Sequence, residues 1–458
     1  MLNRRQVLGT LGAGSLAALA PITASAANPR VIVVGGGMAG VTVAKYIRLW
    51  SGKTIDVTLV TPATTYVSNI MSNLVITGQM AYSTLQFTYA KLASTYGITV
   101  VTGSVTGVSG YGSSATGTVT VSNGKTYTSE RLVLAPGITI DPVAKTGGGT
   151  TDVLHAWQAG SQTTALQALL PTVPNNGSFI LTIPPKPYRC PPGPYERACV
   201  IADYLQRNRP GAKIYVLDAN ADVTAEAVNF RNAFTSYNMA GVLEYWPSTT
   251  FNSVDAGTGP GKQQTVNITT VATANTIGTN PGGTLNLYGN VVNIIPPHRA
   301  PDIVGAAGVI PSGSKFAPVY LHTFESLVSG REKIHIIGDA SDTSLPKAGH
   351  VANQEAKICA SAIVNLLKGT PGNIDTAPTA NSACFSPINS TQASWLTAVY
   401  QYKLTDSAGA SLAPNKRFVI WDGVANTYGA AIEASAPSTG NFSKMNGWYK
   451  VLMAESFT

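Results

Sequence analysis

The sequence predicts an α/β protein with two Rossmann-like dinucleotide-binding domains and a small C-terminal α+β domain. Three observations support this prediction. The 458 residues exceed what a single hydrophobic core usually holds. A glycine-rich loop directly follows an apolar strand near the start of the chain, and a late apolar strand ends in Gly-Asp. Apolar segments typical of a second sheet lie between these two motifs.

Residues 1–26 are predicted to be an export leader. Arg4 and Arg5 form a twin arginine, an apolar run extends from Leu8 to Ala20, and Ala24-Ser25-Ala26 is a small-residue cleavage site. The apolar run is shorter than the roughly 20 residues that span a bilayer, so we expect no transmembrane anchor. Because the twin-arginine route carries folded proteins, the leader predicts a periplasmic protein that already holds a cofactor when it is exported.

The composition narrows the function classes. Charged residues make up 11% of the chain, against about 25% in typical soluble proteins. The net charge is +8, but no Lys/Arg run resembles a nucleic-acid-binding arm, so we expect no nucleic-acid partner. The four cysteines form no CxxC or CxxCH motif, which excludes a zinc ribbon and a c-type haem on this chain. The five histidines are scattered, and no metal site is predicted.

The first β-α-β unit contains the glycine motif. Arg30 to Val34 is an apolar strand, Val41 to Trp50 has helical spacing, and Ile55 to Val60 alternates as a strand. The intervening loop, Gly35-Gly36-Gly37-Met38-Ala39-Gly40, matches G-x-G-x-x-G. A loop of this kind between a strand and a helix predicts dinucleotide binding rather than a ligand-free turn.

Each glycine of the motif has a physical role. Gly35 forms the tight turn, Gly37 lets the backbone approach a pyrophosphate, and Gly40 allows close helix–strand packing. Met38 and Ala39, in the same loop, are predicted cofactor-binding residues with them, because the N-terminus of the following helix offers N–H donors to the ligand. The second strand usually ends in an acid that binds the ribose, but Thr61 occupies that position here. We expect Thr61 to make at most a weaker contact with the ribose.

Later segments complete the predicted fold. Ser178–Pro184, Lys213–Leu217 and Val242–Trp246 are predicted strands of the second sheet, and the stretch from Thr249 to Leu287 is predicted to form hairpins. Lys333–Ile337 is a predicted buried strand and Asn353–Leu367 a helix. We therefore assign residues 27–150 and 300–370 to an FAD-binding domain, 151–299 to a second dinucleotide-fold domain, and 371–458 to a C-terminal domain.

The segment Gly338-Asp339 favours FAD over NAD as the nucleotide at the glycine motif. An apolar strand that ends in Gly-Asp places a carboxylate beside the ribityl chain in FAD enzymes with two dinucleotide folds, whereas a surface turn would not follow a buried strand. Leu345 to Gly349 leads into a helix whose N-terminus faces the flavin pyrimidine and stabilises the anionic reduced flavin. Lys347, in this segment, is a predicted catalytic and cofactor-binding residue.

The chain lacks a second glycine motif. At the corresponding place it has a proline-rich loop from Pro184 to Pro194, and proline has no N–H group with which to bind a pyrophosphate. NADH and NADPH are therefore disfavoured as reductants.

These motifs resemble the flavoprotein subunit of flavocytochrome c sulfide dehydrogenase, a relative of sulfide:quinone oxidoreductase. The resemblance covers almost the whole mature chain and rests on RVIVVGGGMAG, LAPG (Leu134–Gly137), HAWQAGSQT (His155–Thr163), RCPPGPYERA (Arg189–Ala198), IIPPHRA (Ile294–Ala300), TFES (Thr323–Ser326), IHIIGDA and the terminal WY…SFT. It implies a glutathione-reductase-like arrangement, FAD contacts at Ala135 and Gly137, and a dihaem c-type cytochrome subunit as electron acceptor.

Two further positions depart from the family pattern. The family commonly tethers FAD through a cysteine, and the matching residue here is Asn69, so we expect the FAD to be noncovalent. The resemblance also implies a redox-active disulfide beside the flavin. Its first cysteine matches Cys190, but its second matches Ser341, so that disulfide cannot form.

Cys190 therefore has two interpretations. As a nucleophile it passes two electrons from sulfur to the flavin, with Arg189 and Lys186 expected to lower its pKa. Alternatively, it is a small buried residue left from a disulfide-containing ancestor. Cys199 and Cys359 are expected in helix cores, and Cys384 is available to pair with one of them. His155, His298 and His350 are either proton carriers or structural histidines.

Three functions follow from these observations. The leading one is a periplasmic FAD-dependent enzyme that oxidises sulfide or a related sulfur compound and reduces a c-type cytochrome on another chain. A sulfide:quinone reductase-like activity would need a membrane-facing apolar surface, and the C-terminal tail has no clear amphipathic helix. A flavin-binding accessory or electron-transfer subunit without sulfur chemistry is the third, and the loss of the second cysteine favours it.

Overall fold

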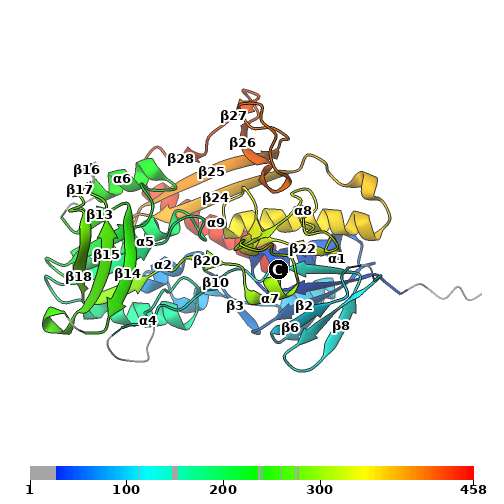
Figure 1. Cartoon of the computed structure of the whole chain (residues 1–458), viewed down its shortest axis with the longest axis horizontal. Helices are drawn as coiled ribbons and strands as arrows, with labels where there is room; N and C mark the ends of the chain where they lie inside the picture. Colours follow the sequence, from blue (N-terminus) through cyan, green and yellow to red (C-terminus); the bar gives the residue numbers. More distant parts are fainter. Residues whose placement is uncertain are drawn as a thin grey trace, which may run out of the picture.

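The computed structural model describes residues 27–112, 114–146, 153–235, 239, 241–257, 259–272, 274–275 and 278–458. The predicted leader, residues 1–26, lies outside the described residues. Figure 1 shows two α/β halves side by side, with the C-terminal strands above them. The first half contains the N-terminal strands, and the second half contains the middle of the chain.

The first sheet has five parallel strands in the order β22-β9-β1-β2-β5. Its strands are β1 (Arg30–Val34), β2 (Asp56–Thr61), β5 (Thr99–Thr102), β9 (Arg131–Leu134) and β22 (Ile334–Ile336). The late strand β22 pairs with β9, which brings the predicted Gly-Asp motif beside the glycine loop that follows β1. Helices α1 (Met38–Trp50) and α8 (Gly349–Leu367) pack against each other and start earlier than predicted.

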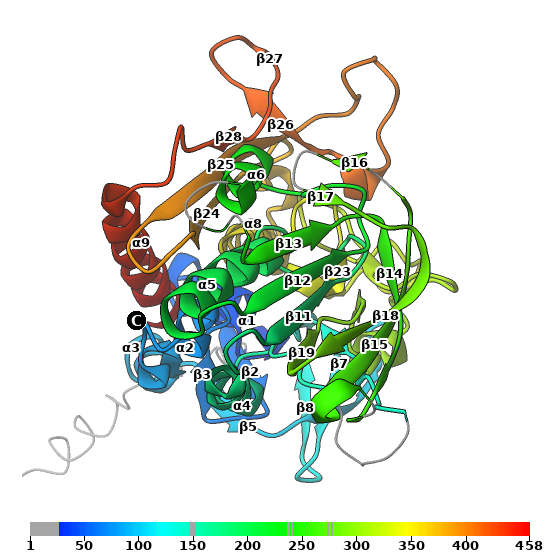
Figure 2. The ribbon, with the colours of Figure 1, turned by 90° about the vertical axis from the view of Figure 1, so that its left-hand side faces the viewer.

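The second sheet is also parallel, in the order β13-β12-β11-β19. Figure 2 shows its four strands side by side: β11 (Ser178–Ile183), β12 (Lys213–Asp218), β13 (Leu243–Trp246) and β19 (Val291–Ile294). The predicted hairpins form an antiparallel sheet of β14 (Thr249–Asp255), β15 (Gln264–Thr270) and β18 (Gly283–Gly289). The strand and hairpin predictions for this region are therefore confirmed.

The C-terminal region forms an antiparallel sheet and a helix that pack on the rest of the fold. Strands β24 (Thr379–Pro387) and β25 (Ala393–Tyr402) form a long hairpin, extended by β26 (Phe418–Asp422), β27 (Thr427–Tyr428) and β28 (Ile432–Glu433). Helix α9 (Thr439–Phe457) packs on this hairpin and on α1. Its last aromatic residue, Phe457, stacks on Tyr66 with ring centroids 5.0 Å apart. The terminal aromatic residue therefore holds the C-terminus against Tyr66.

Shorter elements connect these layers. The helices are α2 (Ser72–Ile76), α3 (Ala90–Tyr96), α4 (Ser161–Leu169), α5 (Gly193–Asn208), α6 (Ala227–Thr235) and α7 (Asp302–Ala306). The antiparallel strands β6 (Val105–Ser109), β7 (Gly117–Val121) and β8 (Thr126–Ser129) form a meander. The strand pairs are β3 (Thr65–Val67) with β4 (Gln86–Thr88), β10 (Thr139–Ile140) with β20 (His298–Arg299), β16 (Ala274–Asn275) with β17 (Gly278–Thr279), and β21 (Ala317–Pro318) with β23 (Ser341–Asp342).

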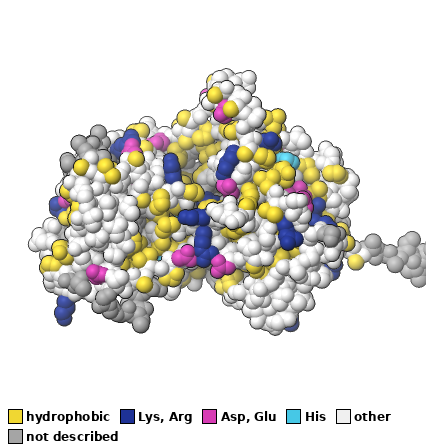
Figure 3. All heavy atoms as spheres, in the orientation of Figure 1, with side chains coloured by type: hydrophobic (Ala, Val, Ile, Leu, Met, Phe, Trp, Pro, Cys, Tyr) yellow, Lys and Arg dark blue, Asp and Glu magenta, His cyan; other side chains and the backbone are white. Residues whose placement is uncertain are grey.

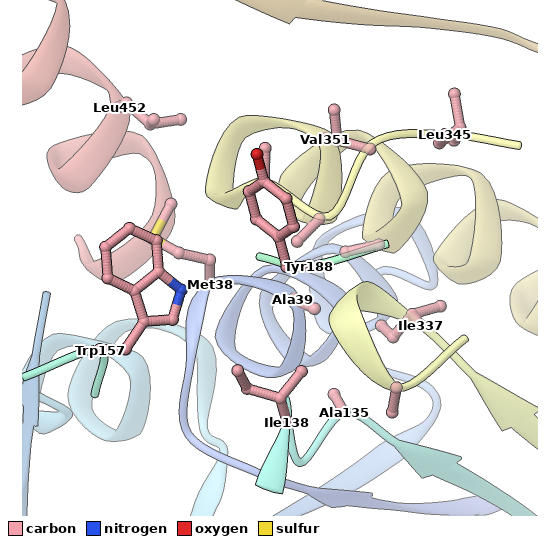
Figure 4. Packing of buried hydrophobic residues seen from close by; sticks show 14 of the residues in the cluster. Met38, Ala39, Ala135, Ile138, Trp157, Tyr188, Ile337, Leu345, Val351 and Leu452 are labelled. Atoms are coloured by element: carbon pink, nitrogen blue, oxygen red, sulfur yellow. The ribbon is translucent and has the colours of Figure 1, made fainter. Parts of the chain in front are cut away.

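One large apolar cluster runs through the main sheets, their helices and the C-terminal region. Figure 4 shows part of this cluster, where side chains from α1, α8, α9 and the loops carrying Trp157 and Tyr188 converge. Charged side chains occupy little of the face in Figure 3, in agreement with the low charged fraction of the sequence. Within the part of the chain that the structure describes, no helix has the length and apolar character needed to cross a membrane.

The packing at the glycine motif generates a stability prediction. A Cβ added at Gly40 would lie 1.8 Å from the carbonyl oxygen of Gly35, so we expect Gly40→Ala to destabilise the fold by about 1–3 kcal/mol. Gly447, inside α9, has open space around it, and Gly447→Ala should leave stability unchanged or raise it by up to about 1 kcal/mol. Chemical denaturation of both variants, each without FAD, measures the difference. Equal free energies of unfolding would contradict the close packing at Gly40.

Candidate functional site

The glycine loop lies between β1 and α1 and is held close to the neighbouring strand. Gly35 has a φ of +112°, and a Cβ there would lie 2.2 Å from the carbonyl oxygen of Ala135. Its N–H donates to the carbonyl of Val60, at 2.8 Å. Gly37 instead faces open space, because the nearest atom to an added Cβ would be 3.7 Å away, on the ring of Tyr66. The loop therefore leaves room for a ligand at Gly37.

A cavity of about 570 Å³ begins at this loop and is here named the cofactor cavity. The first turn of α1 opens onto it, and no side chain caps that helix end. Unpaired N–H groups and the positive end of the helix dipole favour a phosphate there. The predicted residues that line the cavity are Gly35, Gly37, Met38, Ala39, Thr61, Ala135, Gly137, Gly338 and Asp339. Gly40 does not line the cavity and packs against the carbonyl oxygen of Gly35.

The ribose end of the cavity has no carboxylate at the end of β2. Thr61 is buried there, and its hydroxyl lies 3.3 Å from that of Tyr89. Tyr89 in turn donates to the carbonyl of Gly36, at 3.1 Å. Sequence reasoning missed Tyr89, since no motif marks it. The hydroxyl groups of Thr61 and Tyr89 line the cavity where the expected acid is missing, and Ser104 also lines it.

The opposite end of the cavity is formed by the Gly-Asp turn and by α8. The carboxylate of Asp339 accepts a hydrogen bond from Arg189 Nε at 2.7 Å, and the two side chains are only 12% and 13% exposed. Gly349 and Ala352, in the first turn of α8, complete this wall. Glycine loop, carboxylate and second helix N-terminus thus follow one another along a single elongated cavity, as the parts of FAD require.

Lys347 lies between the Gly-Asp turn and α8 and is held by backbone carbonyls of that turn. Its ammonium donates to the carbonyls of Asp339 and Ser341, at 2.9 and 2.7 Å, and lies over the ring of Phe316. Burial lowers its pKa to about 8. It is not among the described residues that line the cofactor cavity. The backbone carbonyls hold the ammonium against the Gly-Asp turn, and the catalytic and cofactor-binding roles of Lys347 stay predictions.

The proline-rich loop between β11 and α5 reaches the Gly-Asp turn of the first half. Arg189, in this loop, extends to Asp339, and its N–H donates to His298 Nδ1 at 2.9 Å. The N–H of Cys190 donates to the carbonyl of Lys347, at 2.7 Å. The loop therefore brings Arg189 to the cofactor cavity, with Cys190 directly after it in the chain.

Cys190 lines a second, smaller cavity of about 90 Å³, here named the thiol cavity. Its walls are mainly apolar and include Trp157, Phe385 and Trp448. Asn69, Arg189 and Gly349 line both cavities, so the thiol cavity adjoins the flavin end of the cofactor cavity. Asn69, at the position of the family's tether, accepts a hydrogen bond from the N–H of Ala159 at 2.7 Å. An amide in this role provides no covalent attachment point for FAD.

The backbone around the thiol cavity is strained. Cys190 has a φ of 57°, and Ala156 and Met71 also have positive φ values. Non-glycine residues in this region cost about 1–3 kcal/mol each and cluster at functional sites. The carbonyl of Cys190 accepts a hydrogen bond from Gly193 at 2.8 Å, so both backbone polar groups of the cysteine hold the conformation.

The electrostatics of Cys190 differ from the expectation. Burial raises the pKa of its thiol well above the usual value, and nearby Cys384 and Glu196 raise that pKa further. The prediction that Arg189 and Lys186 lower this pKa is wrong, because the Arg189 guanidinium is paired with Asp339. The thiol is therefore the dominant form at neutral pH.

A buried polar triad forms one wall of the thiol cavity. Asn73 donates to Glu196 at 2.8 Å and accepts from Arg197 at 2.9 Å. Arg197 also donates to the carbonyls of His155 and Ala156, and its guanidinium lies 4.7 Å from the centroid of the Trp157 ring. Burial raises the pKa of Glu196 to about 7. Glu196, missed by the sequence analysis although it lies in the RCPPGPYERA segment, is the acid that titrates near neutral pH beside Cys190.

The three histidines have structural positions. Each accepts a hydrogen bond at Nδ1 from a backbone N–H, His155 from Trp157, His298 from Arg189 and His350 from Ala383. Burial lowers the pKa of His155 to about 4 and that of His298 to about 3. Among the described residues, no group of three or more His, Cys, Asp or Glu side chains is placed to hold a metal ion.

The cysteines are distributed differently from the expected pairing. Cys199 and Cys359 are buried in α5 and α8, as predicted. Cys384 pairs with neither of them and instead lines the thiol cavity with Cys190. Ser341 is buried, and its hydroxyl donates to the carbonyl of Gly338 at 2.7 Å, outside that cavity. No sequence signal marked Cys384, because a fold contact alone brings it to Cys190.

The carboxylate of Asp339 generates the first prediction for this site. Asp339→Ala should weaken FAD binding about ten- to a hundredfold, because a charge-assisted hydrogen bond is worth roughly 1.5–3 kcal/mol. Asp342 is the matched control, since its carboxylate pairs with Lys416 and does not line the cofactor cavity. Equilibrium titration of each apoprotein with FAD gives the two dissociation constants. Equal constants would contradict the placement of Asp339.

The raised pKa of Cys190 generates a pH prediction. Only the thiolate reacts with iodoacetamide, so the alkylation rate of Cys190 should rise about tenfold for each pH unit from 7 to 9. Peptide mass spectrometry at several reaction times measures the rate for this cysteine alone. A rate that levels off below pH 8 would show that the thiol is activated and would contradict its burial.

Comparisons with known proteins agree with this geometry. Residues 163–296 match the family model of the central part of the sulfide dehydrogenase (flavocytochrome c) flavoprotein chain, and residues 29–167 match the pyridine nucleotide-disulphide oxidoreductase model. The structure is similar to sulfide:quinone oxidoreductase from Aquifex aeolicus, with a TM-score of 0.71 and 15% identity over 94% of this chain and 91% of that one.

Two further structures share the fold at low identity. NDH2 from Plasmodium falciparum, in complex with NADH, has a TM-score of 0.59 and 10% identity over 80% of this chain and 90% of that one. A chain of the covalent putidaredoxin reductase–putidaredoxin complex has a TM-score of 0.58 and 15% identity over 94% of each chain. The chain is therefore a flavin-dependent oxidoreductase with two dinucleotide folds that binds FAD and resembles the flavoprotein subunit of flavocytochrome c sulfide dehydrogenase.

Proposed function

We propose that this protein oxidises sulfide or a related small sulfur compound at Cys190 and passes the electrons through FAD to a c-type cytochrome on another chain, in the periplasm. The observation that carries the proposal is the thiol cavity, in which a strained cysteine adjoins the flavin end of the cofactor cavity. The twin arginine at Arg4 and Arg5 supports the location, and the family resemblance supports a dihaem partner.

The residues around Cys190 have complementary roles. When bound, FAD accepts the two electrons that are released when a sulfide sulfur joins a cysteine thiol. Cys190 binds the sulfur, and Glu196, whose pKa lies near 7, takes up the proton of the thiol. Trp157, Phe385 and Trp448 keep water out of the thiol cavity. The Arg189–Asp339 pair fixes the loop that carries the cysteine.

A second candidate is a flavin-binding electron-transfer subunit without sulfur chemistry. The burial of Cys190 favours this alternative, because a thiol with a raised pKa is a weak nucleophile at neutral pH. In that case the thiol cavity would have no catalytic role, and replacement of Cys190 would not change the electron-transfer activity. The electron acceptor distinguishes a cytochrome-reducing from a quinone-reducing enzyme, since the latter would reduce a soluble quinone faster than a c-type cytochrome.

Anaerobic addition of sulfide to the FAD-loaded protein tests the proposal. We expect sulfide to bleach the flavin absorbance, and Cys190→Ser to slow the bleaching by about a hundredfold or more while FAD stays bound. Cys359→Ser is the matched control, since it also replaces a buried thiol but lines neither cavity. NADH and NADPH should not bleach the flavin.

The outcomes separate the candidates. Full activity in Cys190→Ser would contradict the role of the thiol, and an absent response of the parent protein would favour the electron-transfer subunit. Reoxidation of the reduced protein by a c-type cytochrome rather than by a soluble quinone is expected, and the reverse preference would overturn the proposed acceptor.

A further inference from the structure

Cys384 has a position that the proposed function does not use. It lies in β24, far along the chain from Cys190, yet both cysteines line the thiol cavity. The packing of α5 on β24 brings them together. A cavity of about 90 Å³ has space for roughly three water molecules, so the two cysteines line one small common volume. A negative charge on Cys384 also raises the pKa of Cys190, which places the two sulfurs within electrostatic range.

Cys384 also lines a third cavity on its other side. This outer cavity, of about 330 Å³, is lined by residues that include Pro191, Glu226 and Tyr400. Pro192, Ala348 and Cys384 line both the thiol cavity and the outer cavity. Cys384 is the one of these three shared residues that carries a nucleophilic group. It therefore stands between the sulfur-binding thiol and a larger space on the far side.

The other cysteines do not share this arrangement. Cys199 and Cys359 are fully buried and line neither cavity. Ser341, at the family's second cysteine position, also lies outside both. Within the described residues, the thiol that can meet a sulfur atom held on Cys190 is thus that of Cys384.

We propose that Cys384 accepts sulfane sulfur from Cys190 and presents it to the outer cavity. The inference rests on the proposed function for the natural source of that sulfur. The Cys384 sulfur attacks the outer sulfur of a Cys190 persulfide, the S–S bond on Cys190 breaks, and a new S–S bond forms on Cys384. The proton of the Cys384 thiol passes to the Cys190 thiolate that leaves, and no electrons enter or leave the pair.

Sulfane-sulfur loading of the FAD-containing protein tests the transfer. Sodium tetrasulfide already contains sulfane sulfur, so it can load Cys190 without flavin reduction. After an anaerobic pulse, alkylation and peptide mass spectrometry locate the persulfide on each cysteine. We expect persulfide on Cys190 and Cys384 in the parent protein, at least tenfold less on Cys384 in Cys190→Ser, and retention on Cys190 in Cys384→Ser. Cys359→Ser should behave like the parent.

Two outcomes would overturn the transfer. One is a persulfide content of Cys384 that is equal in the parent and in Cys190→Ser, which would mean that the reagent reaches Cys384 directly. The other is an unmodified Cys384 in the parent protein. If Cys190→Ser does not fold, diamide treatment of the parent replaces it: a Cys190–Cys384 disulfide in the peptide map supports the contact, and its absence contradicts it. A protein that loads Cys384 but is not bleached by sulfide would refute the proposed function and leave the transfer intact.

Discussion

The ion pair between Arg189 and Asp339 is the contact on which the site depends. It joins the loop after β11, in the second sheet, to the turn after β22, in the first sheet. Both side chains are nearly buried, so removal of either one would leave a buried charge without a partner, at a cost of about 3–5 kcal/mol. The pair therefore sets the distance between the two halves where the cofactor cavity ends. It also neutralises the arginine that would otherwise activate the adjacent cysteine.

This ion pair explains why the loop after β11 positions Arg189 and Cys190 instead of binding a nucleotide phosphate. In a dinucleotide fold, the loop after the first strand normally carries the phosphate-binding glycines. Here prolines replace them, and Tyr188 anchors the loop with its hydroxyl 2.7 Å from that of Thr224. Arg189 then lines the cofactor cavity, and Cys190 lines the adjoining thiol cavity. The same segment continues into α5 with Glu196 and Arg197, so a single stretch of sequence provides the thiol, its acid and the cation that orders the wall.

The sequence predicted the local elements and the cofactor end of the site well. Gly35, Gly37 and Asp339 follow strands of one parallel sheet, so the order of the strands is enough to predict that they line one cavity. Prediction failed where burial or distant contacts decide the chemistry. The pKa of Cys190 depends on desolvation, which a neighbouring arginine in the sequence does not reveal. The carbonyl partners of Lys347 were not predicted, because they belong to a turn whose shape no motif encodes. The position of Cys384 beside Cys190 was not predicted, because the C-terminal hairpin meets α5 only in the folded chain.

A crystal structure of the FAD-loaded protein tests the central claim most directly. The account predicts a flavin whose pyrophosphate lies at Gly37, whose ribityl chain contacts Asp339, and whose ring lies roughly 3–3.5 Å from the Cys190 sulfur, the separation of reacting atoms in a productive complex. The loop from Pro184 to Pro192 should keep its path to the cofactor cavity. A structure in which the flavin ring is separated from Cys190 by other side chains, or in which this loop binds a nucleotide, would contradict the account.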